Sequence, residues 1–319
     1  MNRVTLAFEK PIKELEDKID ELERMAHGGQ IGIDSEITKL RIKADKLREE
    51  IFSRLDRWQM VQLARHPQRP YTLDYIKHIS PNFIELHGDR LFRDDFAIVA
   101  GIGNWCNRRV AIIGQQKGRG TKENILRNFG MPHPEGYRKA LRIMRLAEKF
   151  NMPLVTLIDT PGAYPGLGAE ERGQASAIAE NLYAMAELKI PSVAVVIGEG
   201  GSGGALALGV SDKVFMLQYS IYSVISPEGC ASILWRDATK AQLAAEALRI
   251  TAPDLHGFGL VDGIIEEPFG GAHNDPLAIA KSVESTVSRA LDDLLGLEPE
   301  NRIDLRIQKF GKMGQWIEK

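Results

Sequence analysis

The sequence contains very few cysteines, which excludes several classes of protein. Only Cys106 and Cys230 occur among its 319 residues, and they lie far apart in the chain. Two distant cysteines build neither the disulfide framework of a small secreted domain nor a zinc ribbon. We therefore expect a reducing compartment and no cysteine metal site in this chain.

Long hydrophobic runs are also missing. The longest, such as residues 193–197 and 205–208, fall far short of the roughly 20 residues that a membrane-spanning helix needs. Glu9 and Lys10 interrupt the only apolar stretch near the N-terminus, which lacks the order of a signal peptide. These features predict a soluble cytoplasmic protein with no membrane partner.

Charge of one sign is not in excess. Lys and Arg number 41 and Asp and Glu number 43, a formal net charge of -2, so no overall field selects nucleic acid as a partner. The chain does have apolar material, because 44% of its residues are hydrophobic. That content is enough for one large domain or for a core domain with an appendage.

The first 65 residues have the pattern of two amphipathic helices. Apolar side chains recur at helical spacing, first at Ile12, Leu15, Ile19 and Leu22 and then at Ile37, Leu40, Ala44, Leu47 and Ile51. Gly28 and Gly29 mark the end of the first helix, and Asp34 or Ser35 can cap the second. The pattern predicts an N-terminal antiparallel helical hairpin over residues 1–65, a packing or dimerisation arm without catalytic residues.

A change of pattern follows this arm. Pro67 and Pro70 break any helix and favour a boundary, with the main domain over residues 66–319 and its first element near Tyr71. We expect strands over residues 97–102, 110–114, 154–159, 192–197, 213–217 and 261–265, helices over 137–150 and 169–188, and a short helix from Gly204. Such alternation predicts an α/β fold with a largely parallel sheet.

A glycine-rich loop follows one of the expected strands. Residues 192–209 read SVAVVIGEGGSGGALALG, an apolar strand that runs into a turn and then into a short helix. Gly200, Gly201, Gly203 and Gly204 let a ligand approach the main chain closely. Backbone N–H groups at the start of the helix suit an oxyanion that develops during a reaction.

Three interpretations of this loop stay open from the residues alone. Gly198, Gly200 and Gly203 fit the G-x-G-x-x-G pattern of a dinucleotide site, although residues 218–223 lack the acidic residue that such a site needs. Gly200, Ser202 and Gly204 fit the G-x-S-x-G pattern of a serine nucleophile. Its possible partners are Asp212, Asp254, His256, Asp262 and His273. The third interpretation is a tight turn without chemistry.

A second glycine loop strengthens the functional interpretation. After the expected strand at 154–159, residues 160–168 read TPGAYPGLG and lead into a helix with Glu170 and Glu171 in its first turn. Loops at the carboxyl ends of neighbouring parallel strands commonly enclose a ligand. Pro161 and Pro165 stiffen this loop, as the wall of a binding site requires.

Four long segments carry a family resemblance. They read QQKGRGTKENILRNFGMPHPEGYRKALRIMRLAEKF at 115–150, LIDTPGAYPGLGAEERGQ at 157–174, GEGGSGGALALG at 198–209 and YSVISPEGCASILW at 222–235. With these segments the chain resembles the carboxyltransferase alpha subunits of acetyl-CoA carboxylase of the bacterial and plastid multi-subunit type. The resemblance runs from PIKELEDKIDELE in the arm to GGAH at 270–273, and the tail after about residue 294 is least typical.

The resemblance implies a crotonase-like fold, in which ββα units wind into a spiral. It implies transfer of a carboxyl group from carboxybiotin to acetyl-CoA, which yields malonyl-CoA for fatty acid biosynthesis. The backbone oxyanion hole for carboxybiotin falls on Gly203 and Gly204. Around it, substrate would be bound by Gly200, Gly201, Ser202, Pro161, Gly162, Ala163 and Tyr164.

The resemblance also implies partners. A beta subunit would complete an α2β2 heterotetramer and carry the zinc, while this chain binds no metal and no covalent cofactor. Biotin would arrive on a separate carrier protein that a biotin carboxylase has charged. A carboxyltransferase for another acyl-CoA and a serine hydrolase using Ser202 are the alternative activities, and a scaffold without activity is the non-enzymatic one.

Several further residues have a functional and a structural interpretation. Lys117, Arg119, Lys122 and Arg127 form a basic cluster that could hold CoA phosphates or the acidic surface of the carrier, or simply face solvent. Glu228 could line the site or merely open a helix after Pro227. For Cys230 a buried inert thiol is the expectation, and for Trp58 and Tyr71 packing between arm and core.

Overall fold

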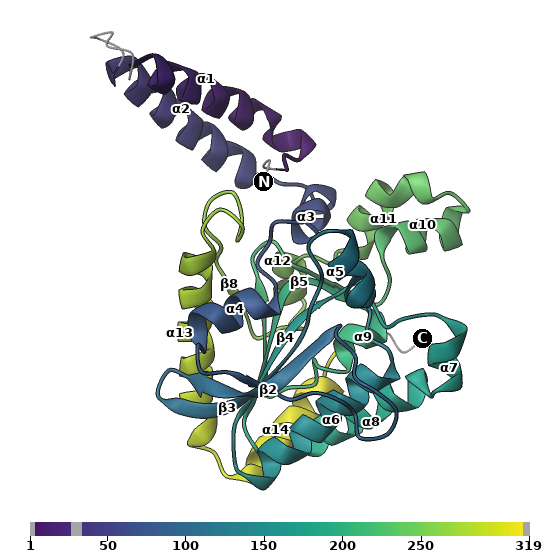
Figure 1. The fold of residues 1–319 in the computed structure, drawn as a ribbon. Coiled ribbons are helices and arrows are strands. Elements are labelled where there is room, and N and C mark those ends of the chain that lie inside the picture. The colour runs from purple at the N-terminus through teal and green to yellow at the C-terminus, as the bar shows by residue number, and fades with distance from the viewer. Residues whose placement is uncertain (1–3, 27–33, 315–319) are drawn as a thin grey trace.

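The computed structural model describes residues 4–26 and 34–314 of the chain. These residues form an α/β body from which a pair of helices projects (Figure 1). The turn at Gly28 and Gly29 lies outside the described residues. Within them, no helix is both long and apolar enough to cross a membrane.

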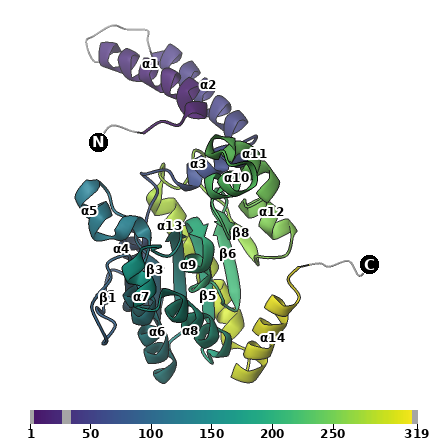
Figure 2. The same cartoon turned by 90° about the vertical axis from the view of Figure 1, so that its right-hand side faces the viewer.

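The projecting pair is the predicted helical hairpin. A short 3-10 turn at Ala7–Glu9 leads into α1 (Lys10–Ala26), which runs alongside α2 (Asp34–Phe52), as Figures 1 and 2 show. Their seam is the predicted apolar stripe, with Ile19, Ile37 and Ala44 buried against Leu15, Leu22 and Leu40. Both helices are therefore confirmed, because the period of their apolar residues was sufficient to place them. The division of the chain at residue 65 stays a prediction.

An eight-stranded sheet forms the centre of the body. Its strands are β1 (Ile84–Glu85), β2 (Ile98–Trp105), β3 (Arg108–Gln115), β4 (Leu154–Thr160), β5 (Ser192–Gly201), β6 (Lys213–Leu217), β7 (Ile221–Ser223) and β8 (Gly263–Ile265). The order is β1-β2-β3-β4-β5-β6-β8, with β7 beside the end of β5. All pairs from β3 onward are parallel and those of β1 and β2 are antiparallel, so the predicted largely parallel sheet is confirmed.

Helices cover both faces of this sheet. On one face α6 (Pro134–Lys149) and α8 (Gln174–Glu187) pack, with Ile113 and Val196 pointing toward them. On the other face lie α4 (Thr72–Ile79) and α13 (Pro276–Leu295), over Ile112 and Val195. Successive strand residues thus enter opposite cores, which explains why these strands are apolar without alternation.

Further helices connect the strands or pack around them. They are α3 (Arg57–Ala64), α5 (Thr121–Leu126), α7 (Leu167–Glu171), α9 (Ser202–Leu206), α10 (Pro227–Trp235), α11 (Ala241–Leu248), α12 (Ala252–Gly257) and α14 (Pro299–Gly311). Short 3-10 turns occupy Asn128–Gly130 and Ala238–Lys240.

Three predicted helices have different bounds, and one of them, the short helix expected from Gly204, begins two residues earlier, at Ser202. The helix expected over 169–188 is divided into α7 and α8, because Gly173 between them adopts a left-handed conformation with φ 80° that cannot continue a helix. The helix expected from Tyr137 begins earlier, at Pro134, since proline fits the first helical position.

The C-terminal helix α14 belongs to the body. Its Arg306 is buried and donates to Asp212 Oδ1 at 2.8 Å and to the Leu188 carbonyl at 2.9 Å. Phe310 packs against the same core as α6 and α8. The segment whose sequence was least typical is therefore fixed by buried contacts.

Candidate active site

Three parallel strands end at one edge of the sheet. β3 ends at Gln115, β4 at Thr160 and β5 at Gly201. Thr160 is in register with Gly200. The loops that follow β4 and β5 are therefore neighbours, as predicted for the two glycine-rich loops.

The two loops touch through positions that only glycine can occupy. A Cβ atom built on Gly204 would lie 2.5 Å from the backbone nitrogen of Ala163 and 2.6 Å from the carbonyl carbon of Gly162. One built on Gly201 would collide with the Pro161 carbonyl. The structure thus brings Pro161, Gly162 and Ala163 against the glycine loop.

Ser202 stands at the junction of β5 and α9. It is exposed and has a left-handed backbone with φ 55°, although it carries a side chain. Gly203 and Gly204 follow it in the first turn of α9, where N–H groups have no preceding helical carbonyl to bond. Amides in such a position can donate to an oxygen that becomes negative during a reaction.

An apolar cavity opens beside Ser202 and Gly203. Its volume is about 310 Å³, and its other lining residues are Leu206, Gly209, Val214, Tyr222, Ser223, Val224, Leu255, Leu260, Phe310 and Met313. Burial raises the pKa of Tyr222 to about 12, so its hydroxyl remains protonated at neutral pH. The cavity can hold a mainly apolar ligand against the amides of the loop.

Tyr164 lies in the middle of the second loop, between β4 and α7. Its ring centroid is 4.1 Å from that of His133, and its backbone N–H donates to the Pro132 carbonyl at 3.0 Å. The carbonyl of Tyr164 accepts from Gln174 Nε2 at 2.9 Å. These contacts tie the second loop to α6 and α8.

A cluster of charges lies under the glycine loop. Lys117 Nζ is 2.7 Å from Asp159 Oδ1 and 3.3 Å from Glu199 Oε2. Arg65 donates to Glu199 Oε1 at 2.6 Å and to Glu228 Oε1 at 2.7 Å. Glu228 therefore faces a cation as well as opening α10.

Burial and ion pairing shift the pKa values of this cluster in opposite directions. Burial alone would raise the pKa of Glu199, but the charges of Lys117 and Arg65 outweigh it and leave that pKa below its ordinary value. Burial alone would lower the pKa of Lys117. The charges of Asp159 and Glu199 outweigh this effect, so the pKa of Lys117 is raised. Lys117 and Glu199 are thus both ionised at neutral pH.

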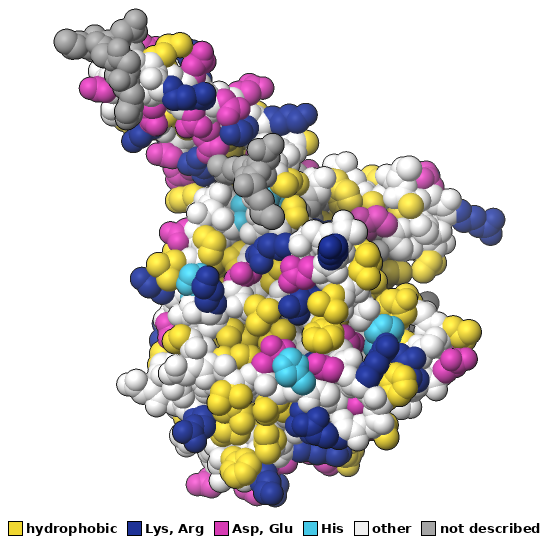
Figure 3. Space-filling view, in the orientation of Figure 1, with side chains coloured by type: hydrophobic (Ala, Val, Ile, Leu, Met, Phe, Trp, Pro, Cys, Tyr) yellow, Lys and Arg dark blue, Asp and Glu magenta, His cyan; other side chains and the backbone are white. Residues whose placement is uncertain are grey.

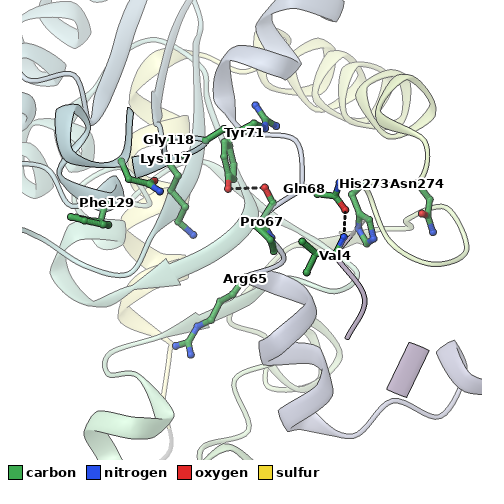
Figure 4. A pocket seen from close by; sticks show the side chains of 13 residues that line it. Val4, Arg65, Pro67, Gln68, Tyr71, Lys117, Gly118, Phe129, His273 and Asn274 are labelled. Carbon is green, nitrogen blue, oxygen red and sulfur yellow. Dashed lines mark hydrogen bonds between the residues drawn. The ribbon is translucent and has the colours of Figure 1, made fainter. Parts of the chain in front are cut away.

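A larger cavity of about 810 Å³ lies beyond this cluster (Figure 4). Lys117, Arg65, Tyr71 and Arg119 are among its lining residues. Arg119 stacks on the Tyr71 ring, 4.6 Å from its centroid, and donates to Asp74 Oδ2 at 2.7 Å. Both cations predicted to bind substrate therefore border one cavity, and each already has a carboxylate partner.

The other two members of the predicted basic cluster lie on α5 and just after it. Lys122 is exposed. Arg127 donates to Glu123 Oε1 at 3.1 Å and to the Phe96 carbonyl at 2.8 Å.

The carboxylates considered as partners of a nucleophilic Ser202 are engaged elsewhere. Asp212 bonds Ser192 and Arg306, Asp254 bonds Arg57 and Thr251, and Asp262 pairs with Lys309. The ring of His273 stacks on that of His66, with centroids 3.9 Å apart. These contacts favour the oxyanion interpretation of the loop over a serine triad.

Of the residues expected only to pack, Trp58 lies on α3 and Cys230 on α10, whereas Tyr71 lines the larger cavity. Trp58 packs against a cluster that includes Val61 and Ile221. Cys230 is buried with Ala231 and Ala244. Among the residues that the structure describes, no group of three or more His, Cys, Asp or Glu could hold a metal ion.

Sequence reasoning missed the polar residues beneath the loop. Gln115, Asp159 and Glu199 are buried at the ends of β3, β4 and β5, yet none was predicted as a site residue. A signal was available, because each is a polar residue among the last three of a mainly apolar strand, where a buried polar group needs hydrogen-bond partners.

Comparison with known proteins shows the family to which the chain is related. Residues 5–314 match the family model described as acetyl co-enzyme A carboxylase carboxyltransferase-like. The chain is 58% identical over 313 residues to the acetyl-coenzyme A carboxylase carboxyl transferase subunit alpha of Geobacter metallireducens, covering 98% of each chain. It is 60% identical to that of Edwardsiella ictaluri, covering 97% of this chain and 98% of the other.

Solved structures with lower identity share the fold. A Pseudomonas malonate decarboxylase hetero-tetramer in complex with coenzyme A matches with a TM-score of 0.60 and 16% identity, over 74% of this chain and 91% of that one. Transcarboxylase 12S matches with a TM-score of 0.54 and 22% identity, over 69% of this chain and 42% of that one. This chain thus spans less than half of the transcarboxylase chain, and the likeness confirms the crotonase-like fold.

Proposed function

The chain belongs to the family of acetyl-CoA carboxylase carboxyltransferase alpha subunits, and on that premise we propose how its two glycine loops serve the reaction. As a carboxyltransferase subunit it acts in the formation of malonyl-CoA. The observation that supports the proposal is the close contact of the loop at 161–163 with Gly204, beside the first-turn amides of α9.

Two negative charges develop during carboxyl transfer. Release of CO2 from carboxybiotin leaves charge on the ureido oxygen, and loss of a methyl proton from acetyl-CoA gives an enolate. We assign the N–H groups of Gly203 and Gly204 to the ureido oxygen. Pre-oriented donors of this kind are worth roughly 10²–10³ in rate each. The released biotin anion takes the methyl proton, so the loop needs no side-chain base.

The apolar cavity beside Gly203 is proposed to receive the rings of biotin. With biotin bound, the apolar side chains of Leu206, Tyr222 and Phe310 that line the cavity would shield the ureido oxygen from water, which would strengthen the hydrogen bonds that the loop donates. In this proposal the two glycine loops form the wall of the biotin site. The wall residues are Pro161, Gly162, Ala163 and Tyr164 of one loop and Gly200, Gly201 and Ser202 of the other.

A beta subunit is proposed to supply the second oxyanion hole, for the thioester enolate. Large apolar side chains lie exposed near the loops, namely Ile125, Phe129, Leu167, Leu206 and Val224, and Figure 3 shows hydrophobic side chains over α5 and towards α9. Such a surface suits a permanent partner. We propose an α2β2 heterotetramer with zinc on beta, served by a biotin carrier protein and a biotin carboxylase.

We propose that Lys117 and Arg119 border the region through which substrate enters. They are not the main residues that bind the phosphates of coenzyme A in this proposal. Arg119 is already paired with Asp74 and is 37% exposed. Because its guanidinium already bonds the Asp74 carboxylate and stacks on Tyr71, we expect Arg119→Ala to change the KM for malonyl-CoA by less than about threefold. Steady-state kinetics of the assembled enzyme measure this, and a tenfold rise would make Arg119 a direct phosphate ligand.

The decisive experiment is malonyl-CoA decarboxylation in the presence of free biotin, the reverse half-reaction. We expect no turnover by this chain alone, turnover with the beta subunit, and no inhibition by a fluorophosphonate. Thioester hydrolysis by the lone chain, with probe attached to Ser202, would overturn the proposal and support a serine hydrolase.

A further inference from the structure

The side chain of Gln115 joins strand β4 to helix α9, the two elements that carry the glycine loops. It is fully buried at the end of β3. Its Nε2 donates to the Gly204 carbonyl at 2.9 Å, and its Oε1 accepts from the Asp159 backbone N–H at 3.0 Å. The two partners fix which end of the amide is which, because one can only accept and the other can only donate.

The bond to Gly204 replaces one that α9 does not make. In a continuing α-helix the Gly204 carbonyl would accept from the N–H of Leu208. Here the N–H of Leu208 bonds the Ala205 carbonyl at 3.1 Å instead, because α9 ends after five residues. Gln115 provides the donor that this short helix lacks, so the orientation of the Gly204 residue depends on a side chain from β3.

The same bonds extend to the charged cluster. Asp159 Oδ1 accepts from the Glu199 backbone N–H at 3.0 Å and from Lys117 Nζ at 2.7 Å. The ends of β3, β4 and β5 are thus held in one buried network. A network in which each member has partners resists displacement of the loop above it.

We propose that Gln115 is a positioning residue for the oxyanion loop, holding the N–H groups of Gly203 and Gly204 in the orientation that the reaction needs. The inference rests on the proposed role of those two amides. Gln115 does not contact substrate in this proposal, and it acts through the Gly204 carbonyl and the Asp159 N–H.

The test compares Gln115→Met with Gln116→Met in the complex with the beta subunit. Gln116 is also buried and also makes two backbone hydrogen bonds, to Leu73 and Lys117, away from the glycine loop. We expect Gln115→Met to lower kcat for malonyl-CoA decarboxylation by about 10- to 100-fold, with KM within about threefold. Gln116→Met should keep kcat within about twofold. Equal kcat in the two variants would overturn the proposal.

A second variant tests the positioning role of Gln115 if Gln115→Met does not fold. Gln115→Glu keeps the acceptor for Asp159, and its protonated form can still donate to the Gly204 carbonyl. Burial and the carboxylate of Asp159, whose backbone N–H bonds this side chain, favour that protonated form, while Lys117 beyond Asp159 opposes it. Tyr137, next to Gly204, stays neutral because burial raises the pKa of its hydroxyl. The kcat of this variant relative to the unsubstituted enzyme should fall as pH rises, and a constant ratio would contradict the proposal.

Failure of this inference is distinguishable from failure of the proposed function. If Gly204→Ala abolishes turnover while Gln115→Met retains it, the amides serve the reaction but Gln115 does not position them. If both variants retain turnover, the oxyanion assignment itself is wrong.

Discussion

Gly204→Ala is expected to lower the kcat of the assembled carboxyltransferase by about 100-fold or more. The new Cβ would lie 2.5 Å from the Ala163 nitrogen and 2.8 Å from the Tyr137 hydroxyl, so the loop must move away from the loop at 161–163. The N–H groups of Gly203 and Gly204 then leave the position of the ureido oxygen. Loss of one donor of this type costs roughly 10²–10³ in rate.

Kinetics of malonyl-CoA decarboxylation with the beta subunit measure this loss, and gel filtration reports whether the subunits still assemble. Gly257→Ala is the matched control, because a Cβ atom there meets nothing within 4 Å. It should leave kcat unchanged. Full turnover by Gly204→Ala in an intact assembly would refute the assignment of the oxyanion hole to this loop.

The parts of the fold that are well predicted from sequence are those whose apolar residues follow a regular local pattern. The stripe through Ile19, Ile37 and Ala44 placed both helices of the arm. The strands that end in the two glycine loops were placed by apolar runs followed by turn residues. Each of these patterns lies within one short segment of the chain. The secondary structure that it predicts therefore does not depend on which distant residues pack against it.

The parts that were missed depend on residues far apart in the chain. Lys117 was predicted to bind substrate, which stays a prediction, but its ion pairs with the carboxylates at positions 159 and 199 were not predicted. No local pattern predicts which strand ends become neighbours. The break at Gly173 was missed for a different reason, because a glycine inside a helical pattern is compatible with a continuous helix.

The same buried cations lead to a prediction for stability. Lys117→Met keeps the apolar stem of the side chain but leaves Asp159 and Glu199, which are 3% and 9% exposed, without the ammonium between them. Removal of one partner from a buried ion pair typically costs about 3–5 kcal/mol. We expect a loss of that size in the free energy of unfolding at pH 7, measured by urea denaturation.

The pH dependence of this loss has a definite sign. In the unsubstituted protein the pKa of Glu199 lies below its ordinary value, so its ion pairs stabilise the fold above the unfolded pKa of about 4.3 and cease to do so as the pH falls through the lower folded value. In Lys117→Met one cation is gone, and ionised Glu199 depends on Arg65 alone. The difference in stability between the two proteins should therefore be largest near neutral pH and shrink as the pH falls below about 4.

The control for this experiment is Lys122→Met, which makes the same chemical change at an exposed lysine of α5. Because an exposed charge contributes little to stability, we expect it to change the free energy of unfolding by less than about 1 kcal/mol at any pH. If Lys117→Met were as stable as Lys122→Met at pH 7, Lys117 would not be needed to balance the charges of Asp159 and Glu199. It would then be available as a cation for substrate, and the phosphates of coenzyme A would be its natural ligand.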